Sequence, residues 1–160
     1  MSETLFPELE HDHRICIDQG INRAKQICSR EGVKFTMLRE NVLRELLASH
    51  QALGAYEIIE RLSKQGRKLS PISVYRIIDV LLAVGLVRRL ESKNAFFACH
   101  LQHDHVNSVV VLVCHQCNRV VETEVPEAEQ AIQALTKANN FAISNTVFEV
   151  HGSCRDCLGT

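Results

Sequence analysis

The chain has 160 residues, of which 46% are hydrophobic and 23% are charged, so it can form one domain or two small ones with a real core. No long apolar run is present, and residues 1–10 carry acidic but no basic side chains, which excludes a membrane span and a secretory signal. Seven cysteines are an odd number, and nothing indicates export. We therefore expect a cytoplasmic protein, whose paired cysteines bind metal more often than they oxidise.

The net charge of −1 conceals an uneven distribution of charged residues. Residues 21–90 carry thirteen basic and six acidic side chains, whereas residues 1–20 and 91–160 each have a net charge of −4. A basic segment between acidic flanks is typical of a module that binds a polyanion. A solvated surface with uneven charge would give the same count.

The first 99 residues predict a tail followed by a helical domain. Residues 1–17 resemble a flexible tail, in which His11-Asp12-His13 and Cys16 form a weak metal-binding cluster or, more commonly, a polar extension. From Asp18 onward, apolar residues recur at helical spacing. The pattern predicts four helices, over about 18–30, 36–50, 55–65 and 72–84. Ser70 caps the last of these and Pro71 occupies its first position.

Residues 86–90 and 95–99 predict two strands around the turn Glu91-Ser92-Lys93-Asn94, which together form a hairpin. Helices followed by a hairpin are the element order of a winged helix-turn-helix, so we assign residues 18–99 to a DNA-binding domain. Ser73, Tyr75 and Arg76 project polar groups near the start of the fourth helix, where they can contact bases or phosphates. In the alternative interpretation, Tyr75 belongs to the core and Arg76 is only solvated.

Two Cys-x-x-Cys pairs dominate the second half of the chain. The first pair is Cys114-His115-Gln116-Cys117 and the second is Cys154-Arg155-Asp156-Cys157, with 36 residues between them. Four thiolates are the tetrahedral shell that zinc prefers, and a closed shell predicts a structural ion. Two disulfides, four unrelated buried cysteines or a redox pair are the alternatives.

Several segments of the chain resemble the ferric uptake regulator family. They are Pro71 to Arg76, continuing to Gly85-Leu86-Val87, together with Leu38-Arg39, Gly54-Ala55-Tyr56 and the two cysteine pairs. The likeness covers almost the whole chain beyond residue 18 and adds Arg39 and Tyr56 to the expected DNA contacts. Within the family, the segment from Glu91 to Cys99-His100 is most similar to zinc uptake regulators, in which a cysteine at this position ligates the sensing metal. Ser73 replaces a threonine of many members and keeps the hydroxyl.

The resemblance implies an α+β fold: a winged helix-turn-helix followed by a small α/β dimerisation domain with a four-cysteine zinc site. Residues 100–106 would form the hinge and residues 107–160 the dimerisation and metal-binding domain. The sequence of this second domain agrees, with apolar strands over 109–113, 120–125 and 147–150 and a helix that begins at Pro126.

A regulatory zinc site is expected at Cys99, His103, His105 and Glu122, with Asp104 and His100 as substitute ligands. A Cys/His/His/Glu set is plausible tetrahedral zinc chemistry, and a thiolate favours zinc over iron. Many zinc regulators have a further ligand where this chain has Arg88, which cannot serve. One or two of the histidines are alternatively plain loop residues, and we expect His115 and His151 to be non-ligands.

The resulting prediction is a repressor, not an enzyme, that controls zinc uptake genes. A homodimer with two zinc ions per protomer would bind inverted-repeat operators in double-stranded DNA, without a membrane or a small-molecule substrate as partner. The alternatives are an iron- or peroxide-responsive regulator of the same family, a zinc enzyme, or a redox or zinc-ribbon interaction module. A deaminase is disfavoured because no His-x-Glu precedes Cys114.

Overall fold

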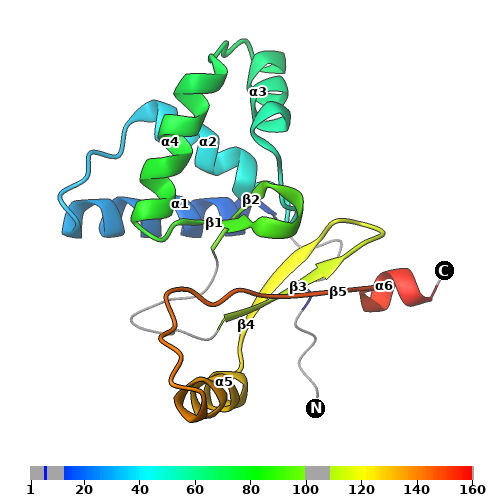
Figure 1. Ribbon diagram of the computed structural model, residues 1–160. Helices are drawn as coiled ribbons and strands as arrows, with labels where there is room; N and C mark the ends of the chain where they lie inside the picture. The colour runs from blue at the N-terminus through cyan, green and yellow to red at the C-terminus, as the bar shows by residue number, and fades with distance from the viewer. Residues whose placement is uncertain (1–5, 7–12, 100–108, 160) are drawn as a thin grey trace. The chain divides into compact units, whose positions relative to one another are not determined.

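A computed structural model describes Phe6 and residues 13–99 and 109–159 (Figure 1). These residues fall into two compact units, 13–99 and 109–159, and Phe6 belongs to the second.

The N-terminal unit begins with four helices, α1 (His13–Arg30), α2 (Met37–Leu47), α3 (Ala55–Lys64) and α4 (Pro71–Ala83). They are followed by β1 (Val87–Leu90), the short 3-10 helix η1 (Glu91–Lys93) and β2 (Ala95–Ala98). The two strands pair antiparallel, with Leu90 opposite Ala95. This order is the predicted winged helix-turn-helix.

Local sequence signals set the starts of α2 and α4. The hydroxyl of Thr36 accepts a hydrogen bond from the Arg39 amide, and the hydroxyl of Ser70 accepts one from the Ser73 amide at 3.2 Å. Such a cap stabilises a helix by about 1 kcal/mol. Gly85, at φ +72, ends α4 in the left-handed conformation that glycine adopts without strain.

Helix α1 begins at His13, so the prediction that it starts at Asp18 was wrong. Ile17 packs against the core one turn before the buried Ile21, and the apolar face of the helix therefore extends into the predicted tail. Cys16 lies on this helix, whereas His11 and Asp12 lie outside the described residues.

The core of the N-terminal unit is formed where α2, α3 and α4 pack together, with the buried faces of α1 and the hairpin added to it. An isolated bridge between Leu53 and Phe96 ties the segment before α3 to β2. The largest fully buried side chains of this unit are Leu43, Leu46, Leu53, Ile58, Leu62, Ile78, Leu81, Leu90, Val42, Val74 and Val87.

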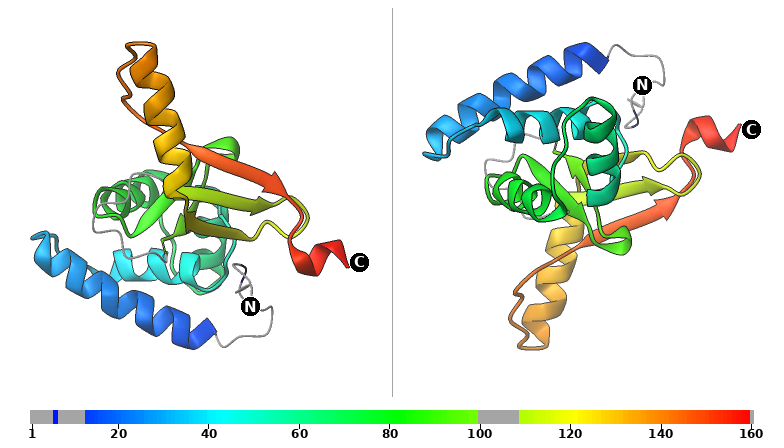
Figure 2. Two further views of the ribbon diagram at one scale, coloured as in Figure 1. Left: turned by 90° about the horizontal axis from the view of Figure 1, so that it is seen from below. Right: turned by 90° about the horizontal axis from the view of Figure 1, so that it is seen from above.

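The second unit is a three-stranded sheet with one long helix (Figure 2). Its elements are β3 (Val109–Cys114), β4 (Val120–Glu124), α5 (Pro126–Ala138), β5 (Phe148–Gly152) and α6 (Arg155–Leu158). The strand order is β4-β3-β5, with β4 antiparallel and β5 parallel to β3. A parallel pair requires a crossover connection, which contains α5.

Strand β3 is almost wholly buried, as its continuous run of apolar residues predicts for a central strand. Strand β5 reaches Gly152 instead of ending at residue 150, because it continues alongside β3 as far as Cys114. The buried apolar residues of this unit are few: Val109, Val110, Val111, Val113, Cys114, Val120 and Cys154. A core of this size benefits from a further constraint.

The observed architecture confirms the predicted α+β fold class with its four-cysteine cluster. Among the described helices, none combines the length and the apolar character that crossing a bilayer requires.

The packing of the N-terminal core predicts a matched pair of mutants. Ile58→Ala removes a side chain that is 0% exposed and should lower the free energy of unfolding by about 2–5 kcal/mol, because it leaves a cavity. Ile72→Ala makes the same change at a 66% exposed position and should alter that free energy by no more than about 0.5 kcal/mol. Urea denaturation measures both, and equal losses would contradict the described core.

Candidate metal centre and nucleic-acid interface

The two cysteine pairs meet because of how β3 and β5 pair. Cys114 is the last residue of β3, and Cys154 follows β5 as the N-cap of α6. In the parallel register Cys114 lies opposite Gly152, so the two strands end at the same edge of the sheet. Cys117 then lies in the tight turn that follows β3, and Cys157 lies in α6, whose N-cap is Cys154.

The four ligand atoms have the spacing of a tetrahedral metal site. The sulfurs of Cys114, Cys117, Cys154 and Cys157 all lie within 4.8 Å of one another. The Sγ atoms of Cys117 and Cys154 are 3.8 Å apart. Zinc–sulfur bonds of about 2.3 Å in a tetrahedron imply sulfur–sulfur edges of about 3.8 Å. None of the seven cysteines forms a disulfide, so the cluster is not a pair of disulfides.

Backbone geometry aims the first pair of sulfurs. Asn118 adopts a left-handed φ of 57°, and its amide donates to the Cys114 carbonyl at 2.9 Å, which closes a tight turn around the pair. The Cys154 amide donates to the Cys114 sulfur at 3.4 Å across the two pairs. Because amide donors favour a thiolate, this turn is suited to a metal ligand.

The environment shifts the pKa values of three of the four thiols, and not all in the same direction. Burial tends to raise the pKa of Cys114, but backbone donors from Cys117, Cys154 and Gln116 outweigh it and lower the pKa to about 5. Hydrogen bonding to Cys154, burial and the other sulfurs raise the pKa of Cys157 to about 12. The pKa of Cys154 is lowered as well, so Cys114 and Cys154 ionise more readily while Cys157 holds its proton, and only a cation makes four thiolates favourable.

One residue of this centre was not predicted from the sequence. Arg119 is only 6% exposed, and its guanidinium donates to the sulfurs of Cys117 and Cys154 and to the carboxylate of Asp156. Burial alone would lower the pKa of Arg119, but these three acceptors raise it above its ordinary value. An arginine two residues after a cysteine is the only sequence signal, and it does not indicate burial.

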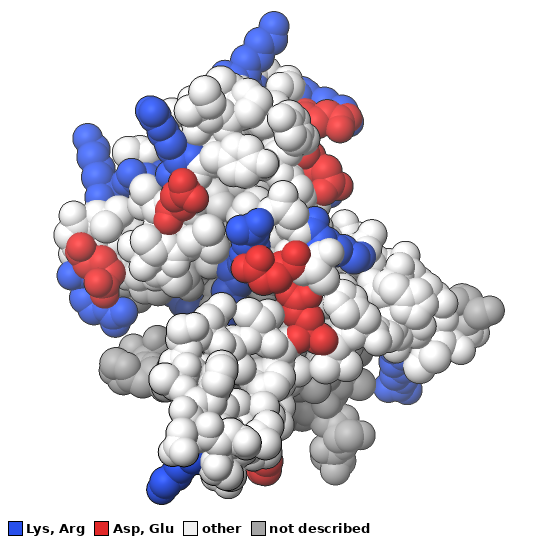
Figure 3. Space-filling model, viewed as in Figure 1, with Lys and Arg blue, Asp and Glu red and all other residues white. Residues whose placement is uncertain are grey.

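The expected DNA-contact residues lie on the N-terminal unit. Tyr75 and Arg76 are exposed near the start of α4, and Tyr56, 70% exposed, opens α3. Tyr75 is 38% exposed, so its side chain is accessible at the surface of this unit. The Ser73 hydroxyl lies 2.9 Å from the Ser70 hydroxyl, and Arg39 donates to the Lys34 carbonyl. In Figure 3, Lys and Arg side chains project from the outer surface of this unit.

The expected regulatory ligands are described only in part. Cys99 is buried after β2, where its amide donates to the Leu86 carbonyl at 3.0 Å and its carbonyl accepts from Arg23 at 3.1 Å. Glu122 lies half-buried on β4. The other expected ligands lie outside the described residues, namely His100, His103, Asp104 and His105. The regulatory set therefore stays a prediction.

Among the described residues, the candidate metal-binding group consists of the four cysteines and includes neither His115 nor His151. The ring of His115 lies 3.5 Å from the Ser153 hydroxyl, and that of His151 lies 3.5 Å from the Glu149 carboxylate.

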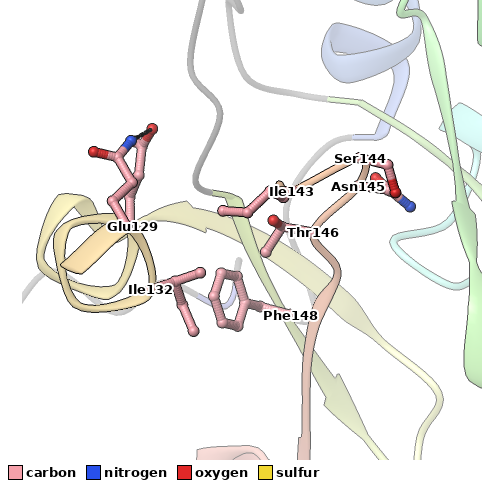
Figure 4. A pocket seen from close by; sticks show the side chains of 8 residues that line it. Glu129, Ile132, Ile143, Ser144, Asn145, Thr146 and Phe148 are labelled. Carbon is pink, nitrogen blue, oxygen red and sulfur yellow. Dashed lines mark hydrogen bonds between the residues drawn. The ribbon is translucent and has the colours of Figure 1, made fainter. Parts of the chain in front are cut away.

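A pocket of about 390 Å³ lies between α5 and the segment that leads into β5 (Figure 4). Ile132 and Phe148 form its apolar floor, and Glu129 accepts a hydrogen bond from Gln133 at 2.9 Å on the α5 side. Among the described residues that line it, Glu129 is the only ionisable one, so these residues do not form a metal-ligand set. The remaining lining residues are Ile143, Ser144, Asn145 and Thr146.

Comparison with known proteins gives consistent matches. The sequence model of the ferric uptake regulator family matches residues 30–151. The zinc uptake regulation protein of Escherichia coli (strain K12) is 31% identical over 136 residues, which are 85% of this chain and 80% of that protein. The peroxide-responsive repressor PerR of Staphylococcus saprophyticus is 30% identical over 130 residues, 79% and 83% of the two chains.

Solved structures agree. A zinc uptake regulator complexed with zinc and DNA has a TM-score of 0.82 at 29% identity, covering 89% of this chain and 95% of its own. Holo XcZur has a TM-score of 0.79 at 34% identity, covering 89% and 99%.

A winged helix-turn-helix followed by a small α/β unit with a four-cysteine centre defines a class of metalloregulators. The chain belongs to the ferric uptake regulator family.

The separated acidities predict how metal binding depends on pH. Near neutral pH the Cys157 thiol is protonated, so zinc must displace at least that proton when it binds. Lowering the pH from about 8 to 6 should therefore weaken zinc binding by at least about tenfold per pH unit. Competition with a chromogenic chelator across this range measures the effect, and a pH-independent affinity would exclude a four-thiolate site.

Proposed function

We propose that this protein is a zinc-responsive transcriptional repressor, not an enzyme, which acts in the cytoplasm on genes for zinc uptake. The observation that carries the proposal is the joint occurrence of the four-cysteine centre, an exposed recognition-helix start and Cys99 after the hairpin in one chain. Zinc uptake regulators among the similar sequences and structures support it.

Structural zinc would occupy the four-cysteine site. A closed four-sulfur shell leaves no position for a substrate, so its role is to hold the end of β3 against the segment that follows β5. The small core of the second unit is consistent with a need for this link.

The proposed DNA interface is the start of α4, with Ser73, Tyr75 and Arg76, together with Tyr56 and Arg39. The N-terminal end of a helix favours an anion, and an arginine near it can contact guanine or a phosphate. Exposed Lys64, Arg67 and Lys68 lie around the turn that leads into α4 and add positive charge beside it. Together they suit the phosphate backbone of double-stranded DNA.

A homodimer is supported by the apolar surface of the second unit. Helix α5 buries none of its residues in one protomer, and Leu135 on it is 60% exposed. Phe141, Val147 and Val150 are also exposed large apolar side chains of this unit. Apolar surface of this extent is typical of a protein interface, and a second copy would place two recognition helices on an inverted-repeat operator.

We assign the regulatory zinc, the second ion per protomer, to Cys99, His103, His105 and Glu122, with Asp104 and His100 as substitutes. Zinc binding to this set would favour the operator-binding arrangement of the winged helices. The coupling between zinc and operator would be about 1–3 kcal/mol, and it must be reciprocal. Zinc should therefore bind more tightly in the presence of operator DNA.

An iron- or peroxide-responsive regulator is the second candidate, because a peroxide-responsive repressor is among the relatives. Cys99 favours zinc, since thiolate ligands select zinc over the harder ferrous ion.

Replacing the cysteine ligand should separate these candidates. Cys99→Ser removes the proposed thiolate and should abolish zinc-dependent operator binding, whereas Cys16→Ser on α1 should leave it intact. Electrophoretic mobility shifts at graded free zinc measure the response, with a thermal melt to verify folding. A variant Cys99→Ser that still responds to zinc, or a wild-type protein that responds to ferrous iron alone, would contradict the assignment.

The DNA interface generates a second prediction. Arg76→Ala should weaken operator binding by about 1–3 kcal/mol, and if Arg76 contacts a phosphate, it should also reduce the slope of log affinity against log salt by about one. Lys137→Ala removes an exposed positive charge from α5 and should change neither quantity. Fluorescence anisotropy at several salt concentrations provides the measurement, and equal effects of the two variants would refute this placement of the interface.

A further inference from the structure

Arg119 is a buried charged residue that the proposed function leaves unused. Its exposed fraction is 6%, and it lies between the first cysteine pair and β4. Burial of a guanidinium is costly unless the charge is paired and its donors are satisfied. Its contacts therefore show which group compensates for the cost.

The guanidinium reaches one sulfur from each cysteine pair. Its Nε donates to the Sγ of Cys117 at 3.3 Å, and its Nη2 donates to the Sγ of Cys154 at 3.0 Å. The same Nη2 forms an ion pair with Asp156, which lies between the two cysteines of the second pair. The rigid planar fork of arginine suits such a bridge, because its donors are fixed relative to one another.

The net charge of the metal-loaded cluster indicates what this bridge does. Four thiolates around a divalent cation leave a net charge of −2 in a cluster of which Cys114 and Cys154 are buried. An uncompensated buried charge is destabilising, and a buried guanidinium in contact with two of the sulfurs offsets part of it. Asp156 touches the guanidinium and holds it in place from the second pair.

Phe6 covers the guanidinium as well. The centre of the Arg119 guanidinium lies 5.8 Å from the centroid of the Phe6 ring, within the range of a cation–π contact. An aromatic ring over a buried cation limits the access of water to it.

We propose that Arg119 is a positioning residue of the four-cysteine zinc centre, which bridges the two cysteine pairs and offsets the negative charge of the zinc–thiolate cluster. It would keep the sulfurs of Cys117 and Cys154 in place and slow the loss of zinc to competing ligands. The inference rests on the structural zinc of the proposed function and does not depend on the regulatory site.

The test measures zinc retention in the full-length protein with three variants. Arg119→Ala removes the bridge, Arg119→Lys keeps the charge without the fork, and Arg155→Ala removes an exposed arginine within the second cysteine pair. Zinc transfer to a chromogenic chelator should be about 10–100-fold faster in Arg119→Ala than in the wild type, as is typical when an outer-shell partner is lost. Arg119→Lys should be intermediate, and Arg155→Ala should match the wild type.

Cobalt substitution gives a readout that a merely structural role would not move. Hydrogen bonds to a thiolate lower the energy of its lone pairs, so their removal should shift the sulfur-to-cobalt charge-transfer band of Arg119→Ala to longer wavelength. Arg155→Ala should leave the band unchanged.

Transfer and spectra as in the wild type for Arg119→Ala would overturn the proposal. If Arg119→Ala does not fold, Asp156→Asn is tested in its place, because it weakens the contact to the guanidinium without removing a zinc ligand. Faster zinc loss from Asp156→Asn supports the proposal, and an unchanged rate overturns it. A wild-type protein that binds no zinc at the four cysteines would instead refute the structural site itself, which distinguishes the two failures.

Discussion

The parallel pairing of β3 and β5 is the constraint on which the metal centre depends. It places Cys114 and Gly152 opposite each other, so that two turns distant in sequence present their sulfurs to one point. The strands themselves supply few buried side chains, and four like-charged ligands would repel one another without a cation. Sheet pairing and metal binding therefore support each other, because the sheet collects the sulfurs and the ion fixes the end of the sheet.

The two units differ in the size of their cores, in their charge and in their metal-binding residues. The N-terminal unit has a larger core, well-capped helices and an exposed start of α4, and carries most of the basic residues. The second unit has a small core, an exposed apolar helix α5 and the four-cysteine cluster. Such a division suits a regulator in which one unit contacts DNA and the other assembles and holds metal.

Much of the fold could be predicted from the sequence because local signals were strong. Ser70 with Pro71 fixed the start of α4, and Gly85 fixed its end. The spacing within each Cys-x-x-Cys pair predicted the cluster, since two intervening residues let the chain aim both sulfurs at one point. The start of α1 was missed because the packing of Ile17 against the core is a tertiary effect. Arg119 was missed for the same reason: its burial depends on where Asp156 and the two sulfurs lie after folding.

Zinc K-edge X-ray absorption of the purified protein, after mild chelation of loosely held metal, is the most direct test of the account. The four-cysteine centre predicts one retained zinc ion per chain, with four sulfur ligands at about 2.3 Å. Nitrogen or oxygen atoms in the shell of the retained ion, or no retained zinc, would contradict it.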